Sequence, residues 1–370
     1  MRGTATRDFA ALHSQLEDIG ADLGYSYGPH KVGFSGKALA EDLPLLVDLL
    51  ADTLRAPAFP ADGVERLRGE RLTLLGYRQQ DTRWQAGRAF RESLYPAEHP
   101  YHHSSSGTLE SLPTLTLDEV RDFHARVYGP RGMILVIVGA VDGPAAVETV
   151  RRHLGDWSNS NQPQPPTLPA LAPLAEARRV HIPVAGKTQS DIVMGTLGPP
   201  RSAADFYAVR LANSVLGQFG MMGRIGDVVR EREGLAYYAY SRVEGGYGPG
   251  PWNVVAGVNP ANVERTIELC LAEIERITSE PVSADDLDDN QAFFIGRMPL
   301  QLETNEGMAG TLHNIEAYGL GLDYLLRHGD IIRALTADDL LAAARRYLHP
   351  DRLVIASAGP QVRAGSGNGA

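Results

Sequence analysis

The sequence predicts an α+β protein made of two homologous units, each a mainly antiparallel sheet with helices packed on one face. The main observation behind this prediction is an internal repeat of a helix-then-strand motif. Leu115, Thr116, Asp118, Arg126, Pro130 and Gly139 recur 220 positions later (335 minus 115) as Leu335, Thr336, Asp338, Arg346, Pro350 and Gly359. A hairpin pattern after Gly20 is likewise matched by one after Gly234. We therefore expect residues 20–139 to superimpose on residues 234–359.

The first half contains segments with apolar residues at helical spacing and segments with the pattern of a strand. The expected helices span residues 6–19, 43–54, 63–77, 84–94 and 116–128, and the expected strands span residues 22–27, 31–35 and 133–139. Thr116 is the expected N-cap of its helix, because Asp118 and Glu119 follow in the first turn. The apolar segment 133–139 is predicted to be the buried strand that closes this half.

Residues 158–173 are rich in Pro, Asn, Ser and Gln, a composition typical of a linker. The predicted organisation is a first unit at residues 1–157, a linker at 158–177, a second unit at 178–361 and a disordered tail at 362–370. In the second unit we expect strands at 179–183, 190–196 and 353–358, a hairpin with a glycine-rich tip at 244–251, a short helix ending at Gly234, and further helices at 203–219, 261–277, 284–298, 306–318, 322–327 and 337–347.

Composition excludes several classes of protein. The net charge of -10, without a strongly basic cluster, argues against nucleic acid and anionic membranes as partners. Cys270 is the only cysteine, which rules out an intramolecular disulfide or a cysteine-based zinc cluster. The longest apolar run, residues 133–141, is far shorter than the roughly 20 residues of a membrane span. No signal region is visible, so the chain as written is expected in the cytoplasm, with export open if the true N-terminus lies upstream.

The most informative stretch, residues 229–240, joins a charged helix end to an aromatic strand. Gly234 follows a run of helix formers and is the expected C-terminal cap, free to adopt a positive φ. Arg230 is then expected in the last helical turn, and Tyr237 at the start of the strand. On these residues alone, Arg230 could simply interact with the helix dipole and Tyr237 could be an ordinary core residue.

An arginine followed seven positions later by a tyrosine, with Gly234, Leu235 and Ala236 directly before the tyrosine, resembles a pair in the insulinase, pitrilysin and mitochondrial-processing-peptidase family of zinc metallopeptidases. The resemblance implies that Arg230 and Tyr237 hold the substrate backbone and the developing oxyanion at a zinc site in the other half. It extends to the two-copy layout of the chain.

The same resemblance implies that the zinc motif is missing. Residues 1–4 resemble the segment that follows an inverted His-x-x-Glu-His motif, whose histidines bind zinc. In the second half, residues 179–222 precede the short helix, and no counterpart precedes Met1, so we expect the first unit to lack its initial strands and helix. The family's third ligand, a glutamate, falls at Thr73 and Leu74, which cannot ligate as carboxylates. Glu70, one turn away, is interpreted as a residue of a solvated helix face.

Other candidate sites are incomplete. His313 and Glu316 begin a zinc-like spacing that no second histidine completes. His99, His102 and His103 are interpreted as belonging to a surface loop without function, because no carboxylate is spaced to complete a metal site. Residues 245–250 are rich in glycine but lack the Lys-Ser/Thr of a phosphate-binding loop.

Three functions remain. The first is a zinc-free subunit, without a cofactor of its own, that supplies Arg230 and Tyr237 to a zinc-bearing partner of the same family or to a second copy, with an unfolded peptide as substrate. The second is an active zinc metalloendopeptidase whose zinc segment lies upstream of this start. The third is a structural scaffold subunit. Leu74 argues against the second, and the retained pair argues against the third, so the first is the predicted function.

Overall fold

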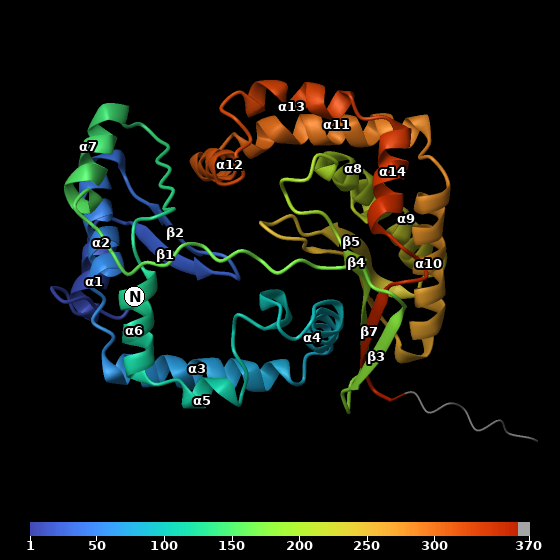
Figure 1. The fold of residues 1–370 in the computed structure, drawn as a ribbon, viewed down its shortest axis with the longest axis horizontal. Coiled ribbons are helices and arrows are strands. Elements are labelled where there is room, and N and C mark those ends of the chain that lie inside the picture. The colour runs from blue at the N-terminus through green and yellow to red at the C-terminus, as the bar shows by residue number, and fades with distance from the viewer. Residues whose placement is uncertain (362–370) are drawn as a thin grey trace, which may run out of the picture. The chain divides into compact units, whose positions relative to one another are not determined.

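The computed structural model describes residues 1–361 and confirms the α+β class (Figure 1). The chain forms two compact units, each described here by itself. Unit 1 comprises residues 1–76, 105–167 and 301–319, and unit 2 comprises residues 77–104, 168–300 and 320 onward. The boundaries that the sequence suggested, with a linker at 158–177, stay a prediction. The predicted disordered tail at 362–370 lies outside the described residues.

Unit 2 contains a five-stranded sheet in the order β3-β7-β4-β6-β5. Its strands are β3 (Arg178–Pro183), β4 (Ser190–Leu197), β5 (Ala236–Val243), β6 (Pro251–Val258) and β7 (Val354–Gly359). All neighbouring strands are antiparallel except β3 and β7. The strands and the hairpin expected in this half are therefore present, and the sheet is mainly antiparallel as predicted.

Helices cover both faces of this sheet. One face packs against α8 (Phe206–Gly217), α10 (Val263–Ser279) and α14 (Ala337–Tyr347), and its core includes fully buried Trp252 and Leu340. The other face packs against α4 (Thr82–Leu94), whose alanines and Phe90 contact β4, β6 and β7. Unit 2 also contains α9 (Phe219–Gly226), α11 (Ala284–Gln301), α13 (Tyr324–Arg333) and the short helices η2 (Pro100–His102), η3 (Asp227–Arg232) and η4 (Pro260–Asn262). Because apolar side chains meet helices on both sides, β4 and β6 are buried almost throughout.

Unit 1 has a much smaller core. Its helices and strands are α1 (Phe9–Asp18), β1 (Asp22–Tyr27), β2 (Val32–Lys37), η1 (Ala40–Asp42), α2 (Leu43–Arg55), α3 (Ala61–Arg78, ending two residues past the unit), α5 (Ser111–Thr114), α6 (Leu117–Val127), α7 (Gly143–Leu154) and α12 (Asn305–Ala317). The buried cluster between α1 and α2 consists of Leu12, Leu16 and Leu49. The hairpin of β1 and β2 is mostly exposed, and no residue of α6 is buried. A two-stranded sheet with so little apolar cover is marginally stable.

The repeat is visible in helix capping. The Thr116 side chain accepts from the backbone N–H of Glu119, and Glu119 returns a contact to the Thr116 backbone, which makes a capping box at the start of α6. Thr336 and Asp339 make the same reciprocal contacts at the start of α14. The predicted N-cap at Thr116 is therefore confirmed, and the two helices of the repeat begin in the same way.

Helix α7 is absent from the sequence-based prediction. Its signal is Asp142, which accepts a hydrogen bond from the backbone N–H of Ala145 at 2.9 Å, followed by Pro144 in the first turn. An N-cap followed by a proline is a known helix start. Its predominantly polar surface made the helical periodicity hard to see, because only Ala146 and Leu154 are buried.

The predicted strand at residues 133–139 is wrong. In unit 2 the equivalent strand, β7, is hydrogen-bonded along one edge to β3 and along the other to β4. Among the described residues nothing pairs with residues 134–138, and β1 and β2 pair only with each other. The apolar side chains of residues 133–138 are half-buried without a ladder. A β-strand requires hydrogen bonds to a neighbouring strand, so the apolar character of residues 133–139 was not enough to make them a strand.

The two copies of this segment should differ in the rate of backbone hydrogen exchange. We expect the backbone amides of Leu135–Val138 to exchange quickly and those of Ile355–Ala358 to exchange about 10³-fold or more slowly, because only β7 has hydrogen-bonded neighbours. Peptide-resolved deuterium uptake would measure this, with β6 as the protected reference. Equal protection of both segments would contradict the assignment.

Candidate functional site

Arg230 lies on an irregular helical stretch of unit 2. The preceding helix α9 has non-helical backbone angles from Gly220 to Gly223, and Arg230 then falls within a π-helical segment, η3. The sequence predicted an ordinary last helical turn, and this detail is corrected. A π-helical turn holds one residue more per hydrogen-bonded ring than an α-helix, and such turns are frequent at functional sites. The side chain of Arg230 is 34% exposed, and its Nε lies 3.4 Å from Glu231 Oε1.

Gly234 ends this stretch as predicted. Its φ of +62° is the left-handed conformation that glycine adopts without strain. The N–H of Leu235 donates to the carbonyl of Val229 at 2.9 Å, and the N–H of Glu233 donates to that of Val228 at 3.2 Å. Two helix carbonyls are thereby satisfied before the chain enters β5.

Tyr237 lies at a β-bulge on β5, which is an edge strand of the sheet. Ala236 pairs with Val258 and Tyr238 pairs with Gly257, so Tyr237 is the extra residue between two adjacent positions of β6. A bulge of this kind turns a side chain away from the regular alternation. The Tyr237 side chain is 87% exposed, and its hydroxyl makes no hydrogen bond with the described residues. The reading of Tyr237 as a core residue is therefore wrong.

Arg230 and Tyr237 occupy the two ends of one short segment, on either side of Gly234. No hydrogen bond joins their side chains within residues 1–361, and the contact of Arg230 with Glu231 is of the exposed, weak kind. The guanidinium fork and the phenol are thus both available to an oxygen acceptor from outside the unit.

A buried aspartate next to this site was missed in the sequence. Asp191 on β4 is 1% exposed and accepts hydrogen bonds from the Tyr238 hydroxyl and, at 2.5 Å, from the Thr82 hydroxyl on α4. Gln189 Nε2 lies 3.3 Å from both carboxylate oxygens. Burial raises the pKa of Tyr238, and the hydrogen bond to Asp191 raises it further, so the phenol remains a donor. An aspartate inside an apolar strand was the available signal.

Gly257 makes the contact between Asp191 and Tyr238 possible. Both residues pair with Gly257, Asp191 from β4 and Tyr238 from β5, so the tyrosine reaches across the middle strand. A Cβ atom at Gly257 would lie 2.5 Å from Tyr238 Cε1. The glycine therefore leaves room for the ring, and the buried hydrogen bond fixes β5 immediately beside the bulge at Tyr237.

The residues at the expected third zinc-ligand position do not fit a metal. Thr73, in unit 1, donates its hydroxyl to the carbonyl of Gly69 at 2.9 Å, and Leu74 is a partly exposed apolar side chain. Glu70 is held by Arg66 at 3.2 Å and Arg2 at 3.5 Å. In residues 1–361 no group of three or more His, Cys, Asp or Glu side chains is arranged to hold a metal ion.

The histidine loop lies at the surface, as interpreted, but one of its three histidines is buried. His99 is 1% exposed, and its Nδ1 accepts from the backbone N–H of Tyr101 at 3.1 Å. Its ring stacks on Tyr95, and His102 Nδ1 lies 2.8 Å from the Tyr95 carbonyl. These histidines therefore stabilise the loop through ring and backbone contacts.

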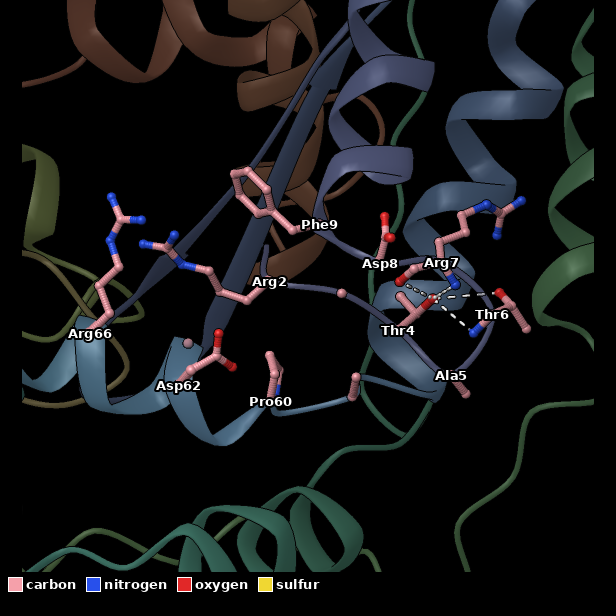
Figure 2. A pocket seen from close by; sticks show the side chains of 13 residues that line it. Arg2, Thr4, Ala5, Thr6, Arg7, Asp8, Phe9, Pro60, Asp62 and Arg66 are labelled. Carbon is pink, nitrogen blue, oxygen red and sulfur yellow. Dashed lines mark hydrogen bonds between the residues drawn. The ribbon is translucent and has the colours of Figure 1, made fainter.

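Unit 1 has an open pocket of about 610 Å³ near the start of the chain (Figure 2). Its charged side chains include Arg2, Asp62 and Arg66, and the Arg2 guanidinium lies over the ring of Phe9 at 5.6 Å. The lining contains no His, Cys or Ser, and its hydroxyls come from Thr4 and Thr6.

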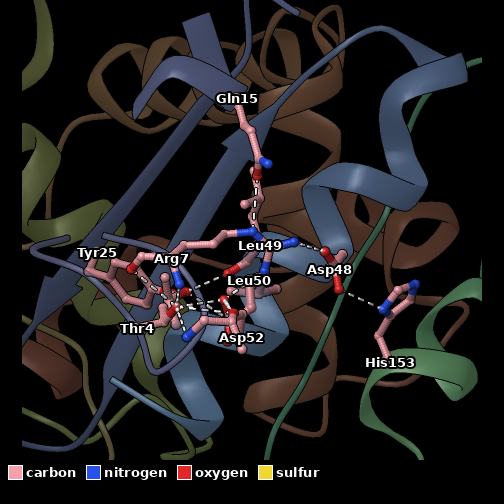
Figure 3. Close-up of polar contacts among 11 residues, drawn as sticks. Thr4, Arg7, Gln15, Tyr25, Asp48, Leu49, Leu50, Asp52 and His153 are labelled. Carbon is pink, nitrogen blue, oxygen red and sulfur yellow. Dashed lines mark hydrogen bonds and ion pairs between the residues drawn. The ribbon is translucent and has the colours of Figure 1, made fainter. Parts of the chain in front are cut away.

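One wall of this pocket is fixed by an ion-pair network (Figure 3). Asp52 accepts from the hydroxyls of Thr4 at 2.7 Å and Thr6 at 2.8 Å and pairs with Arg7 at 2.7 Å. Arg7 also pairs with Asp48 at 2.5 Å. Burial alone would raise the pKa of Asp52, but the three hydrogen bonds outweigh it and lower the pKa. Residues 4–7 are thereby tied to α2, so the network has a structural role.

Comparison with known proteins shows what the chain resembles. The family model described as "Peptidase M16 inactive domain" matches residues 114–293. An uncharacterized zinc protease of Streptomyces coelicolor is 25% identical over 94% of this chain and 76% of its own length. The chain is therefore similar to peptidase M16 proteins. Another relative, the mitochondrial-processing peptidase subunit beta of Saccharomyces cerevisiae, is 22% identical over 82% of this chain and 68% of its own.

The M16 fold is confirmed by a solved structure. The peptidase M16 inactive domain from Pseudomonas fluorescens superimposes with a TM-score of 0.85 at 26% identity, covering 98% of this chain and 86% of that one. The predicted resemblance to the processing-peptidase family is therefore confirmed. No helix among the described residues of the chain is long and apolar enough to cross a membrane.

A substitution at Gly257 should test the contact beside the bulge at Tyr237. We expect Gly257→Ala to lower the free energy of unfolding by about 1–3 kcal/mol, because the new methyl group overlaps the Tyr238 ring. Gly87→Ala, inside α4 with open space around it, should instead raise stability by about 0.5–1 kcal/mol. Urea unfolding would measure both. A neutral Gly257→Ala would show that Tyr238 does not need this space.

Proposed function

We propose that this protein is the zinc-free subunit of a two-subunit peptidase and supplies Arg230 and Tyr237 to the substrate at a zinc-bearing partner of the same family. The observation that carries the proposal is the bulge on β5, which presents the Tyr237 hydroxyl to solvent without a hydrogen bond. The names of the relatives support it, because they include zinc proteases and a protein printed as a subunit of the mitochondrial processing peptidase.

The chemistry that the pair offers is stabilisation of negative charge. Arg230 carries a permanent charge and a planar fork of donors, and Tyr237 carries a neutral hydroxyl donor. Both stabilise a carbonyl oxygen most when it gains negative charge during peptide hydrolysis. Neither can activate water, so the proposal gives the chain no peptidase activity of its own. The proposed substrate is an unfolded peptide, held by strand addition to a sheet edge.

Two alternatives make different forecasts. If the protein is an active zinc metalloendopeptidase whose zinc segment lies upstream, Tyr237 acts within one polypeptide and no partner is needed. If it is a structural scaffold, loss of the Tyr237 hydroxyl has no effect on any rate. The bulge at Tyr237 favours the catalytic-partner proposal over the scaffold, because bulges that redirect a side chain are over-represented next to active sites.

Metal content separates the proposal from the first alternative. We expect the purified chain to hold no stoichiometric zinc, because Thr73 and Leu74 offer no carboxylate and Glu70 is ion-paired. A chelator should leave its melting temperature unchanged, and the chain alone should cleave no peptide. Elemental analysis and calorimetry would test this. One tightly held zinc per chain would overturn it.

Reconstitution tests the role of the pair. Mixed with a zinc-bearing M16 subunit from the same organism, the chain should switch on peptide hydrolysis. Tyr237→Phe or Arg230→Ala should then lower turnover by roughly 10²-fold to 10³-fold, the loss expected for one oxyanion donor, without weakening assembly. Tyr247→Phe, an exposed tyrosine on the same hairpin, is the matched control and should keep the full rate. An unchanged rate for Tyr237→Phe would favour the scaffold.

A further inference from the structure

The pocket of unit 1 is lined by an arginine whose donors the fold leaves unused. The Arg2 side chain is 32% exposed, and its Cζ lies 5.6 Å over the ring of Phe9. Its Nη2 lies 3.5 Å from Glu70 Oε1, and within residues 1–361 its guanidinium makes no hydrogen bond. A guanidinium group carries five N–H donors in a planar fork. The donors of Arg2 are therefore available to a ligand in the pocket.

A second guanidinium group lies beside the first. Nε of Arg66, on α3, donates to Glu70 Oε1 at 3.2 Å, and this is the same oxygen atom that Arg2 approaches. The two arginines thus converge on one small acceptor, and their Nη atoms make no hydrogen bond with the described residues. Figure 2 shows both guanidinium groups on the same side of the pocket. Two such forks suit a carboxylate, which accepts through two oxygen atoms.

The same pocket is lined by carboxylates. Asp62, in the first turn of α3, is exposed and forms no hydrogen bond or ion pair among the residues that the structure describes. Arg66 lies one helical turn further along, but it turns toward Glu70 instead. Asp8 uses one of its carboxylate oxygens as the N-cap of α1, accepting from the backbone N–H of Ala11 at 2.8 Å. The pocket therefore offers negative as well as positive charge to a ligand.

Arg2 packs against the first turn of α3. A Cβ atom at Gly63 would lie 3.5 Å from Cβ of Arg2 and 3.0 Å from Cγ of Pro60. Gly63 follows Asp62 directly, so the guanidinium group and the free carboxylate belong to adjoining parts of one wall (Figure 2). No ion pair joins Arg2 to Asp62 within residues 1–361. Each of these charges can therefore hold one end of a ligand.

Other parts of the lining are apolar, and one wall is held in place. The Phe9 ring is 46% exposed, and Ala58 and Pro60 also line the pocket. The hydrogen bonds around Asp52 tie residues 4–7 to α2 (Figure 3). The volume of about 610 Å³ lies within the range of small-molecule sites. The pocket thus has room for a small molecule with an apolar group.

We propose that this pocket binds a zwitterion, either a free amino acid or a short peptide, with its carboxylate on Arg2 and Arg66 and its ammonium group on Asp62. A simple anion is repelled by Asp62 and a simple cation by the arginines, whereas a zwitterion matches both charges. The exposed Phe9 ring offers a contact to an apolar side chain. The proposed ligand site is independent of the function proposed above.

Blocked ligands test the two charges separately. Calorimetric titration of the full chain with leucine should give a saturable heat, and leucine should raise the melting temperature. N-acetyl-leucine, which lacks the ammonium group, and leucinamide, which lacks the carboxylate, should each bind about tenfold or more weakly. Leucyl-leucine binding more tightly than leucine would assign the site to short peptides, and equal or weaker binding would assign it to free amino acids. Equal binding of either blocked ligand, or no binding of leucine and leucyl-leucine, would overturn the proposal.

Substitutions locate the site. Arg2→Gln should weaken leucine binding roughly tenfold to a hundredfold, the loss expected for one charge-assisted contact. It should change the melting temperature little, because the Arg2 side chain makes no hydrogen bond with the described residues. Asp62→Asn should weaken leucine binding but leave the binding of N-acetyl-leucine equal or tighter, which a general loss of structure would not do. Arg151→Gln, exposed on α7 and paired with Glu148, is the matched control and should bind leucine like the wild type. Wild-type affinity for leucine in either Arg2→Gln or Asp62→Asn would overturn the proposal.

Discussion

The sheet of unit 2 depends on β7, because this strand alone joins the parallel strand β3 to the antiparallel part of the sheet. It joins β3, the first strand of the unit in sequence, to β4, and through β4 to β6 and β5. Its side chains are buried from both faces, by α4 on one side and by the helices around α14 on the other. The last strand in the sequence therefore completes the hydrogen-bond network and the core, and the edge strand β5 that carries Tyr237 is linked to it through β6 and β4.

The candidate site is built from two departures from regular structure. The π-helical segment adds a residue to a helical turn at Arg230, and the bulge adds a residue to a strand at Tyr237. Gly234 lies between them and reverses the chain. Each insertion changes the direction of one side chain without moving the element that carries it. The buried contact of Asp191 with Tyr238 supports the second insertion from within the sheet, which explains how an exposed residue can have a fixed place.

Local signals in the sequence predicted much of this fold. Few residue types satisfy the backbone geometry of a helix cap, so the residue type at these positions was enough to predict Thr116 as an N-cap and Gly234 as a C-cap. The strand expected at residues 133–139 failed because pairing depends on segments distant in the sequence. The bulge, the π-helical turn and the reach of Tyr238 across Gly257 also arise from tertiary contacts. A carboxylate in an apolar strand indicates a buried polar contact, so Asp191 could have been singled out from the sequence. Its hydrogen-bond partners could not, because Thr82 and Tyr238 are distant from it in the sequence.

The unpaired segment at residues 133–138 has a consequence for the handling of the protein. Its residues are Met, Ile, Leu, Val, Ile and Val, which have high β-propensity and no charge or proline to interrupt pairing. Backbone groups without partners in such a segment are a template on which another chain can add as a strand. The rate of strand pairing between two chains rises with protein concentration, whereas the folding of a single chain does not depend on concentration. Dilution, or rapid capture by a binding protein, therefore favours the monomer over aggregates. The same concentration dependence applies during synthesis, because many copies of the segment emerge close together on one polysome.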